Sequence, residues 1–256
     1  MHDRTTRVLA AALALLMMIM LASAPPTRTE AQAQAPAPPR PTDQVARTRP
    51  NRAAEAVLRS AAAPAATMPA NMTQNVEGAG PATGWLLEDY GTSGGEYFFG
   101  KRNCEPLAGS FAGWAVGGGA DGASLACGDN YPNDMYTIAT YGPFSLANAR
   151  TAVLKYNFTG ASELEYDYLF VAASIDDYYY CGNFYSDDWS DSYYVDELDL
   201  SNLGCSGMPS TLLGQPNVTI AFFFVSDYNV NNIGFQVDNI SLTTTLNQPT
   251  STPTSR

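Results

Sequence analysis

Short apolar and alternating runs, separated by Gly, Asn, Asp and Pro, follow one another from Thr73 onward. Such runs are typical of β-strands, and no long stretch repeats its apolar residues with the helical period. We expect strands at Trp85–Tyr90, Tyr97–Lys101, Phe111–Val116, Met135–Thr140, Thr151–Phe158, Tyr166–Ile175, Asp191–Leu200, Val218–Val225 and Gly234–Leu242. Many short strands within residues 73–246 predict an all-β fold, an antiparallel two-layer β-sandwich of the jelly-roll type.

Two of these runs indicate how their strands are buried. In residues 151–158 (TAVLKYNF), apolar side chains from Ala152 to Phe158 alternate with polar ones such as Lys155, which predicts one face on the core and one in water. Residues 218–225 (VTIAFFFV) are apolar on both faces. This pattern predicts a central strand, with one face on the core and the other covered by a loop.

The N-terminal residues have the features of an export signal. Two arginines precede the uncharged apolar run Val8–Ala24, which has 17 residues. This arrangement is typical of a secretory signal peptide, which we place within residues 1–33. Small residues that suit cleavage occur at both Ala22–Ala24 and Ala31–Ala33, and a retained N-terminal anchor is the alternative, because about 20 residues cross a membrane. After cleavage we expect a secreted protein, free or attached to the cell surface, with no membrane span.

The segments on either side of the predicted sandwich are poor in core-forming side chains. Residues 34–72 are rich in Ala, Pro, Thr and Arg, and residues 247–256 are rich in Pro and Thr. Such stretches bury too little apolar surface to offset their chain entropy. We expect a disordered linker before the sandwich and a disordered tail after it.

The four cysteines, Cys104, Cys127, Cys181 and Cys205, all lie within the predicted sandwich. An even number in an exported chain indicates two disulfides with a structural role. Four cysteines permit three connectivities, and we favour sequential pairing, Cys104 with Cys127 and Cys181 with Cys205, because it closes two loops of similar length.

Charge and histidine content exclude several classes of function. Residues 73–246 carry four Lys or Arg and 21 Asp or Glu, a net charge of 4 − 21 = −17. So acidic a block disfavours nucleic acid and leaves cations or neutral polymers as partners. The single histidine, His2, lies in the predicted signal peptide, so the mature protein would lack Ser-His-Asp, Cys-His and His-ligated metal sites.

Several segments carry a resemblance to a known family. They include GSFAGWAVGGGADG, YGPFSLANARTAVLKYNF, YDYLFVAASID, GQPNVTIAFFFVSD and GFQVDNISL. Together they resemble the jelly-roll accessory module of immune inhibitor A-type secreted bacterial metallopeptidases and, more loosely, MAM domains, over residues 76–243. The resemblance implies a non-catalytic domain, often with a structural calcium ion. The chain departs from the family in its insertion at residues 178–205.

Calcium is the cofactor that this composition and resemblance favour. Calcium takes six to eight oxygen ligands, and the acid excess suits neutralisation by a cation. By the resemblance, Glu77 near the first strand and Asp238 on the last strand would meet at one edge of the sandwich, and Asp121 would add a third carboxylate. The alternative is that Asp121 is a turn residue and Glu77 a solvated carboxylate.

Residues 176–194 (DDYYYCGNFYSDDWSDSYY) concentrate aromatic and acidic side chains. Aromatic faces stack on apolar sugar faces, and carboxylates accept hydrogen bonds from hydroxyl groups, so the tract is a candidate contact for polysaccharide or protein. The candidate ligand-binding residues are Tyr178, Tyr179, Tyr185, Asp187, Asp188 and Trp189. The alternative is that alternate tyrosines pack as a strand pair while the acids face water.

A third candidate is hydrolysis by paired carboxylates. Laminarinase-like glycosidases carry a Glu-x-Asp-x-x-Glu strand that places nucleophile and acid on one face. In this chain Glu165 and Asp167 match, but Phe170 stands in the position of the general acid, and Glu163 would share the face of the first two. We therefore predict a non-enzymatic recognition module for extracellular polysaccharide or protein. The alternatives are an accessory domain for a separately encoded secreted protease and, less favoured, a laminarinase-like glycosidase.

Overall fold

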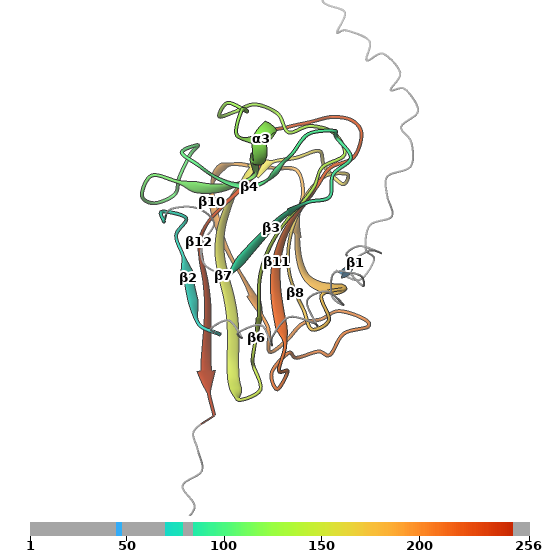
Figure 1. The fold of residues 1–256 in the computed structure, drawn as a ribbon. Helices are drawn as coiled ribbons and strands as arrows, with labels where there is room; N and C mark the ends of the chain where they lie inside the picture. The colour runs from blue at the N-terminus through green and yellow to red at the C-terminus, as the bar shows by residue number, and fades with distance from the viewer. Residues whose placement is uncertain (1–44, 48–69, 79–83, 248–256) are drawn as a thin grey trace, which may run out of the picture. The chain divides into compact units, whose positions relative to one another are not determined.

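Two antiparallel β-sheets face each other in the computed structural model of the chain, which describes residues 45–47, 70–78 and 84–247 (Figure 1). Sheet A has the order β1-β9-β8-β11-β6-β3, and sheet B has the order β10-β7-β12-β5-β4, with β2 paired to β12. The predicted all-β, two-layer antiparallel sandwich is confirmed.

The strands of sheet A are β1 (Val45–Arg47), β3 (Trp85–Asp89), β6 (Tyr136–Phe144), β8 (Tyr168–Ser174), β9 (Tyr179–Tyr185) and β11 (Val218–Val225). Those of sheet B are β2 (Met72–Gln74), β4 (Phe98–Arg102), β5 (Ala112–Gly118), β7 (Ala149–Ala161), β10 (Asp188–Asp199) and β12 (Gly234–Leu246). Among the described residues, the short helix α3 (Gly119–Gly122) follows β5. No helix among the described residues is long and apolar enough to cross a membrane.

The core lies between the sheets and is rich in aromatic rings. Phe222 on β11 and Tyr156 on β7 meet there edge to face, with ring centroids 5.7 Å apart. The alternation predicted for β7 is confirmed, because Leu154, Tyr156 and Phe158 are buried while Lys155 is exposed. Aromatic pairs of this geometry add to the free energy gained by burying their surface.

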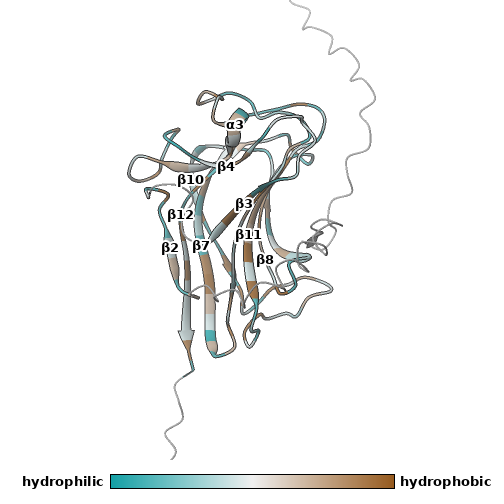
Figure 2. Cartoon of the chain, in the orientation of Figure 1, coloured by the Kyte–Doolittle hydropathy of each residue, from teal (hydrophilic) through white to brown (hydrophobic). Residues whose placement is uncertain are grey.

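Strand β11 is central in sheet A and buried on both faces, as its sequence predicts. Phe222 and Phe224 point into the core, whereas Phe223 belongs to a second apolar cluster on the outer face of the sheet. The buried members of that cluster are Ile138, Phe170, Ala172, Tyr180, Ala221 and Phe223. The brown colour along β11 in Figure 2 marks this concentration of apolar residues.

Strand β9 is the main element that the hydrophobic pattern does not predict. Its sequence, YYCGNFY, mixes tyrosine with polar residues. Cys181 and Tyr185 belong to the core cluster, whereas Tyr180 and Phe184 lie on the outer face of sheet A. Tyrosine has an apolar ring and a polar hydroxyl. The strand can therefore bury side chains on both faces although its sequence is not a run of purely apolar residues.

Most of the predicted signal peptide, linker and tail lies outside the described residues. Within the predicted linker, however, β1 pairs with β9, and Met72 pairs with Leu242 on β12. The described part of sheet B therefore begins slightly before the predicted boundary at Thr73. The expected proximity of the first and last strands of the sandwich holds for β2 and β12.

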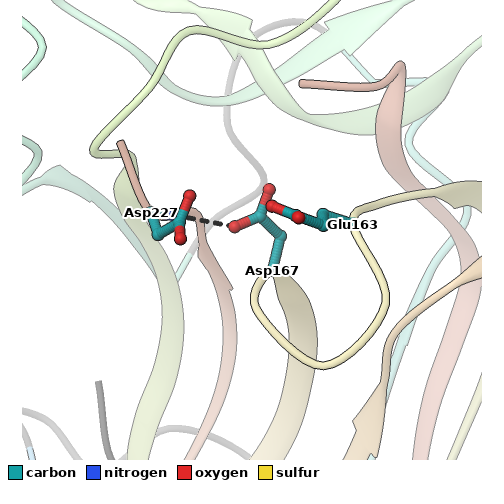
Figure 3. Close-up of side chains that lie close together, drawn as sticks. All are labelled: Glu163, Asp167 and Asp227. Carbon is teal, nitrogen blue, oxygen red and sulfur yellow. Dashed lines mark hydrogen bonds between the residues drawn. The ribbon is translucent and has the colours of Figure 1, made fainter. Parts of the chain in front are cut away.

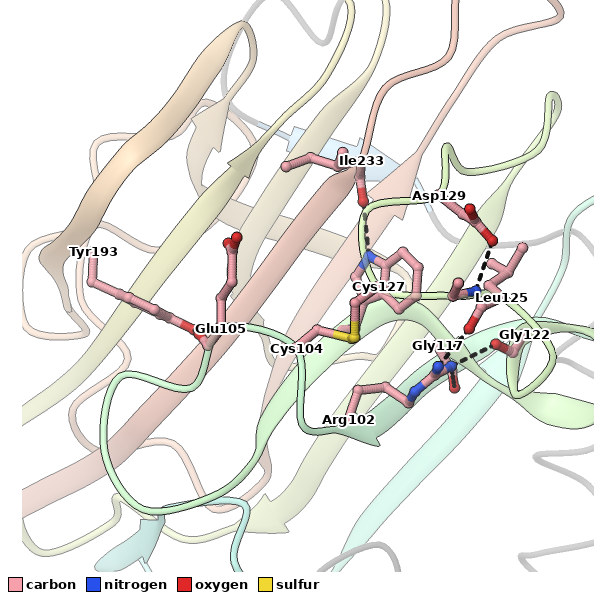
Figure 4. Close-up of a disulfide and its surroundings, with 12 residues drawn as sticks. Arg102, Cys104, Glu105, Gly117, Gly122, Leu125, Cys127, Asp129, Tyr193 and Ile233 are labelled. Carbon is pink, nitrogen blue, oxygen red and sulfur yellow. Dashed lines mark hydrogen bonds between the residues drawn. A yellow bond between two sulfur atoms is a disulfide. The ribbon is translucent and has the colours of Figure 1, made fainter.

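Both disulfides show the sequential pairing, Cys104–Cys127 and Cys181–Cys205. Cys181 lies on β9 in sheet A, and Cys205 follows β10 of sheet B, so this bond links the two layers. Near Cys104, Arg102 donates hydrogen bonds to the carbonyls of Gly117, Gly122 and Leu125, as Figure 4 shows. The guanidinium and the disulfide together hold the loop after β5.

Candidate functional site

Three carboxylates meet where β8 begins and β11 ends. Glu163 and Asp167 belong to the turn before β8, and Asp227 follows β11. Each side chain contributes one carboxylate oxygen to a group of three that lie within 4.8 Å of one another, and Figure 3 shows the three side chains. Asp167 and Asp227 are buried, and Glu163 is half-buried. We call these residues the acidic triad.

Hydrogen bonds fix the acidic triad from several loops. Asp167 Oδ1 accepts the backbone N–H of Asp227 at 2.7 Å, and Asp167 Oδ2 accepts the hydroxyl of Tyr131 at 2.5 Å. The same Tyr131 hydroxyl accepts the backbone N–H of Glu163 at 3.2 Å. Asp227 Oδ1 accepts the backbone N–H of Asn229 at 2.8 Å. The triad is therefore positioned mainly by backbone groups and one buried tyrosine.

The electrostatic environment of Asp167 opposes its ionisation. Burial raises the pKa of the Asp167 carboxyl to about 7, and the charges of Asp227 and Glu163 add to the rise. Hydrogen bonds from Tyr131 and Asp227 act in the opposite direction but are outweighed. Burial and the hydrogen bond to Asp167 also raise the pKa of Tyr131. Near neutral pH, this carboxyl therefore holds a proton in a large fraction of molecules.

The arrangement expected for a laminarinase-like strand is wrong. Glu165 lies in a turn with φ of 74°, and β8 begins only at Tyr168, so Glu163, Glu165 and Asp167 do not alternate along a strand. Instead the backbone N–H of Asp167 bonds to the carbonyl of Glu163 at 3.1 Å, which closes a tight turn. That turn, rather than strand alternation, brings Glu163 and Asp167 together.

The structure divides the predicted calcium ligands Glu77, Asp238 and Asp121 between two places. Glu77 Oε1 accepts the backbone N–H groups of Ser110 and Phe111, and Asp238 Oδ2 accepts those of Leu107 and Ala108. Both carboxylates thus hold the loop before β5. Burial, chiefly, and the charge of Glu77 raise the pKa of Asp238.

Asp121 lies elsewhere, in α3. Its Oδ2 accepts the backbone N–H of Glu96 at 2.8 Å, while Glu96 Oε2 accepts the N–H of Ala120 at 2.7 Å. Among the described residues, the group of acids with ligand atoms close enough for one cation is the acidic triad. Calcium binding by Glu77, Asp121 and Asp238 stays a prediction.

The tyrosine-rich tract is split between the two ends of β9. Tyr178 precedes β9 and Tyr179 is its first residue; their rings meet edge to face at 4.7 Å, and Tyr178 is 40% exposed. Beyond the other end, Asp187 lies in the turn after β9 and Asp188 is the first residue of β10; both are exposed. A strand of this length separates its ends by about 20 Å, so the predicted residues form two groups rather than one.

Tyr185 and Trp189 lie on the side of the sandwich where edge strand β10 faces β9, and their rings meet edge to face at 5.9 Å. Tyr185 is buried, and its hydroxyl donates to Asp196 Oδ2 at 2.5 Å. Burial raises the pKa of Tyr185 strongly, and the charge of Asp196 contributes to the rise. Trp189 is half-buried and meets Tyr194 edge to face at 4.9 Å. Strands β9 and β10 belong to different sheets, so their tyrosines do not pair with each other within one sheet.

Further along this side, a cleft of about 270 Å³ opens between β9 and the end of β10. Its polar lining residues are Asn183, Glu197, Asp199 and Asn202. Asn183 Nδ2 donates to the carbonyl of Glu197 at 3.2 Å and so bridges the two sheets. We call this cleft, together with the rings of Trp189 and Tyr194 earlier on β10, the β9–β10 groove.

A second cavity, of about 360 Å³, opens at the β3 and β4 edge. Apolar side chains such as Trp85, Leu87 and Phe98 line it. Lys101 also borders it, but its ammonium donates to the carbonyls of Glu77 and Gly78 and stacks over Phe111. The cavity therefore offers mainly apolar surface.

No protein-family model matches the sequence, and no curated protein is significantly similar to it. Solved structures with a similar fold include the family 11 carbohydrate-binding module of the cellulosomal cellulase Lic26A-Cel5E of Clostridium thermocellum, at 15% identity and a TM-score of 0.41. The match covers 72% of this chain and 99% of that module. The same family's module in complex with a β-1,3-1,4-mixed-linked tetrasaccharide matches at 13% identity and a TM-score of 0.39, over 70% of this chain and 99% of that one.

A third match is the K1 cleaved adhesin domain of Lys-gingipain from Porphyromonas gingivalis W83. It has 12% identity and a TM-score of 0.40, over 68% of this chain and 97% of that domain. The resemblance to immune inhibitor A-type modules and MAM domains stays a prediction.

Proposed function

We propose that the protein is an exported, non-catalytic binding module that holds an extracellular polysaccharide in the β9–β10 groove. The observation that carries this proposal is the composition of the groove, in which the amides of Asn183 and Asn202 line the cleft and two aromatic rings lie earlier on β10. Sugar hydroxyls form hydrogen bonds with such polar groups, and aromatic rings pack against the apolar faces of sugars. The matched structures have TM-scores below 0.5, so the choice of polysaccharide as the ligand does not rest on what those modules bind.

The groove suits a chain-like ligand because it follows a strand. Tyr194 and Leu198, which lines the cleft, share one face of β10 and are four positions apart, which corresponds to about 13 Å. A flexible polymer can lie along such an edge without entering the core. Because Trp189, Tyr194 and Asp196 are half-buried, their positions are largely set before a ligand arrives, which lowers the entropy cost of binding.

Neither the acidic triad nor the acids of the β9–β10 groove have the arrangement that glycoside hydrolysis requires, which supports a non-catalytic role. Hydrolysis of a glycosidic bond needs two carboxyl groups that flank the bond in an accessible cleft. Asp167 is fully buried, and Phe170, at the position of the missing acid, packs in the outer apolar cluster. In the groove, Glu197 forms an ion pair with Lys155 at 3.1 Å, and Asp199 Oδ1 accepts the N–H of Ser201.

Two disulfides support an extracellular location, because such bonds form and persist outside the reducing cytosol. Export through the predicted signal peptide is part of the proposal. The alternative from the sequence, an accessory domain that assists a secreted protease, would use a protein ligand instead.

The proposal is tested by affinity electrophoresis of the exported protein in gels that contain soluble mixed-linkage β-glucan, xylan, galactomannan or galactan. We expect retardation by at least one polymer. Tyr194→Ala and Asn202→Ala should each weaken that retardation about 10-fold in dissociation constant. Val195→Ala is the matched control, because Val195 is 72% exposed on the same strand but outside the groove.

No retardation by any polymer, or equal retardation of Tyr194→Ala, Asn202→Ala and wild type, would count against the proposal. Capture of a single secreted protein without any polysaccharide binding would favour the accessory role.

A further inference from the structure

The acidic triad joins three segments that are distant in sequence. Glu163 and Asp167 lie in the turn before β8, Asp227 lies in the connection from β11 to β12, and Tyr131 brings in the loop before β6. Side-chain amides add to this junction, since Asn130 Nδ2 donates to the carbonyl of Asn231 at 3.0 Å. An ion bound here would tie one whole end of the sandwich together.

One carboxylate oxygen of the acidic triad has no hydrogen-bond partner. Asp227 is only 7% exposed, and its Oδ2 is buried without a partner among the described residues. Its other oxygen is already used by the N–H of Asn229. Burying a carboxylate oxygen without a donor or a cation costs free energy, which native structures normally avoid. Within the described part of the chain, Asp227 Oδ2 therefore lacks a hydrogen-bond donor, and its side chain lies close to Glu163 and Asp167.

The basic side chains in the described part of the sandwich do not neutralise the triad. Lys101 and Arg102 donate to backbone carbonyls, Lys155 pairs with Glu197, and Arg150 is exposed at the start of β7. The charged groups that shift the pKa of Asp167 are Asp227 and Glu163, both of which are acidic. Positive charge must therefore come from a proton or from a bound cation.

The donor set selects the kind of cation. Carboxylate oxygens are hard ligands that suit calcium and magnesium, whereas zinc prefers imidazole and thiolate. All four cysteines are in disulfides, and the single histidine is His2. Calcium lies 2.3–2.6 Å from its ligands, so the ligands of one ion lie no more than about 5 Å apart. The triad oxygens meet this condition, because they lie within 4.8 Å of one another. Magnesium needs a tighter octahedron.

We propose that Glu163, Asp167 and Asp227 bind one calcium ion, which stabilises the end of the sandwich formed by the turn before β8 and the connection from β11 to β12. This site is distinct from the predicted ligands Glu77, Asp121 and Asp238, and it does not depend on polysaccharide binding. We expect an affinity typical of extracellular calcium modules, with a Kd of about 10⁻⁴–10⁻³ M.

The test uses the exported full-length chain, freed of metal with a chelator and then dialysed. Isothermal titration with CaCl₂ should show one site that Asp227→Asn and Glu163→Gln each weaken at least 10-fold. Glu165→Gln is the matched control, because it removes one negative charge from the same turn without removing a triad carboxylate. Its affinity should equal that of the wild type. Glu77→Gln, tested alongside, reports on the other predicted site.

Thermal unfolding gives a second readout. With calcium at about 100 times its Kd, the melting temperature of the wild type should rise by about 5 °C, and that of Asp227→Asn should stay constant. In chelator, Asp227→Asn should melt at or above the wild-type temperature, because it removes a repelling charge. This result also shows that the variant folds.

Three outcomes would overturn the proposal. They are the absence of calcium binding by the wild type, undiminished binding by both triad variants, and loss of binding in Glu77→Gln alone. An equal thermal shift with MgCl₂ would overturn the assignment of calcium as the ion.

Discussion

The hydroxyl of Tyr131 donates a 2.5 Å hydrogen bond to Asp167, although the two residues are 36 positions apart in the chain. Both side chains are almost fully buried. The same hydroxyl accepts the backbone N–H of Glu163. One phenol oxygen therefore satisfies two groups of the turn before β8 and holds that turn against the loop before β6.

Removing this hydroxyl should destabilise the fold. In Tyr131→Phe, the Asp167 carboxyl loses a donor and the N–H of Glu163 loses its acceptor, which should lower the free energy of unfolding by about 1–3 kcal/mol. Urea denaturation of the metal-free protein measures the change. Tyr166→Phe, a half-buried tyrosine of the same turn, is the control and should change stability by less than about 0.5 kcal/mol. Equal stability of Tyr131→Phe and wild type would show that the bond contributes nothing.

The bond between Cys181 and Cys205 links the two sheets and closes a loop with a sequence separation of 24. Loop closure of this size is worth about 3 kcal/mol in the chain-entropy model. The double variant Cys181→Ala/Cys205→Ala should therefore unfold at a lower urea concentration by a corresponding amount. An unchanged urea midpoint of the double variant would contradict a stabilising role for this disulfide.

Gly182 on β9 lies against the neighbouring strand β8. A Cβ atom at this position would collide with the backbone carbonyl of Val171, which cannot move without breaking the pairing of the two strands. Gly182→Ala should therefore cost about 1–3 kcal/mol or more. Gly204→Ala is a matched control, because a Cβ there meets nothing within 4 Å. Thermal melts of the two variants should differ clearly, and coincident melts would refute the packing argument.

Glu77 anchors the loop before β5 through the backbone N–H groups of Ser110 and Phe111, at 2.8 and 2.9 Å. Glu77→Ala should leave these amides open to solvent and increase their hydrogen exchange at least 10-fold. Exchange within β11 should stay constant, because that strand is held by both neighbours in sheet A. Glu105→Ala, an exposed acid in the same loop region, provides the comparison. Unchanged exchange at Ser110 in Glu77→Ala would mean that other contacts hold the loop.

The hydrophobic pattern was enough to predict the class of fold. Strand β11 has the predicted bounds, and β7 shows the predicted alternation, because burial between two layers selects side chains with period two. The pairing of the cysteines also agrees with the sequence-based expectation. Strand β9 was not predicted, because tyrosine buries its ring while keeping a polar sequence signature.

The acidic triad shows where local pattern stops being informative. Glu163 and Asp167 stand out in the sequence, but period two predicts a shared strand face for them, whereas a tight turn with Glu165 at positive φ brings them together. Asp227 carries no local signal. The register that pairs Val225 with Tyr168 places Asp227, two residues beyond β11, beside Asp167, the residue before β8.

The sequence by itself determined the two-layer all-β fold and the strong acidity of its folded part, because these follow from composition and from periodicities of a few residues. It favoured one of three cysteine pairings, which the structure shows. Only the tertiary structure decided which acids lie together and which tyrosines line a groove. Those contacts depend on strand register and on the assignment of β9 and β10 to different sheets, and both are set by packing between residues far apart in the chain.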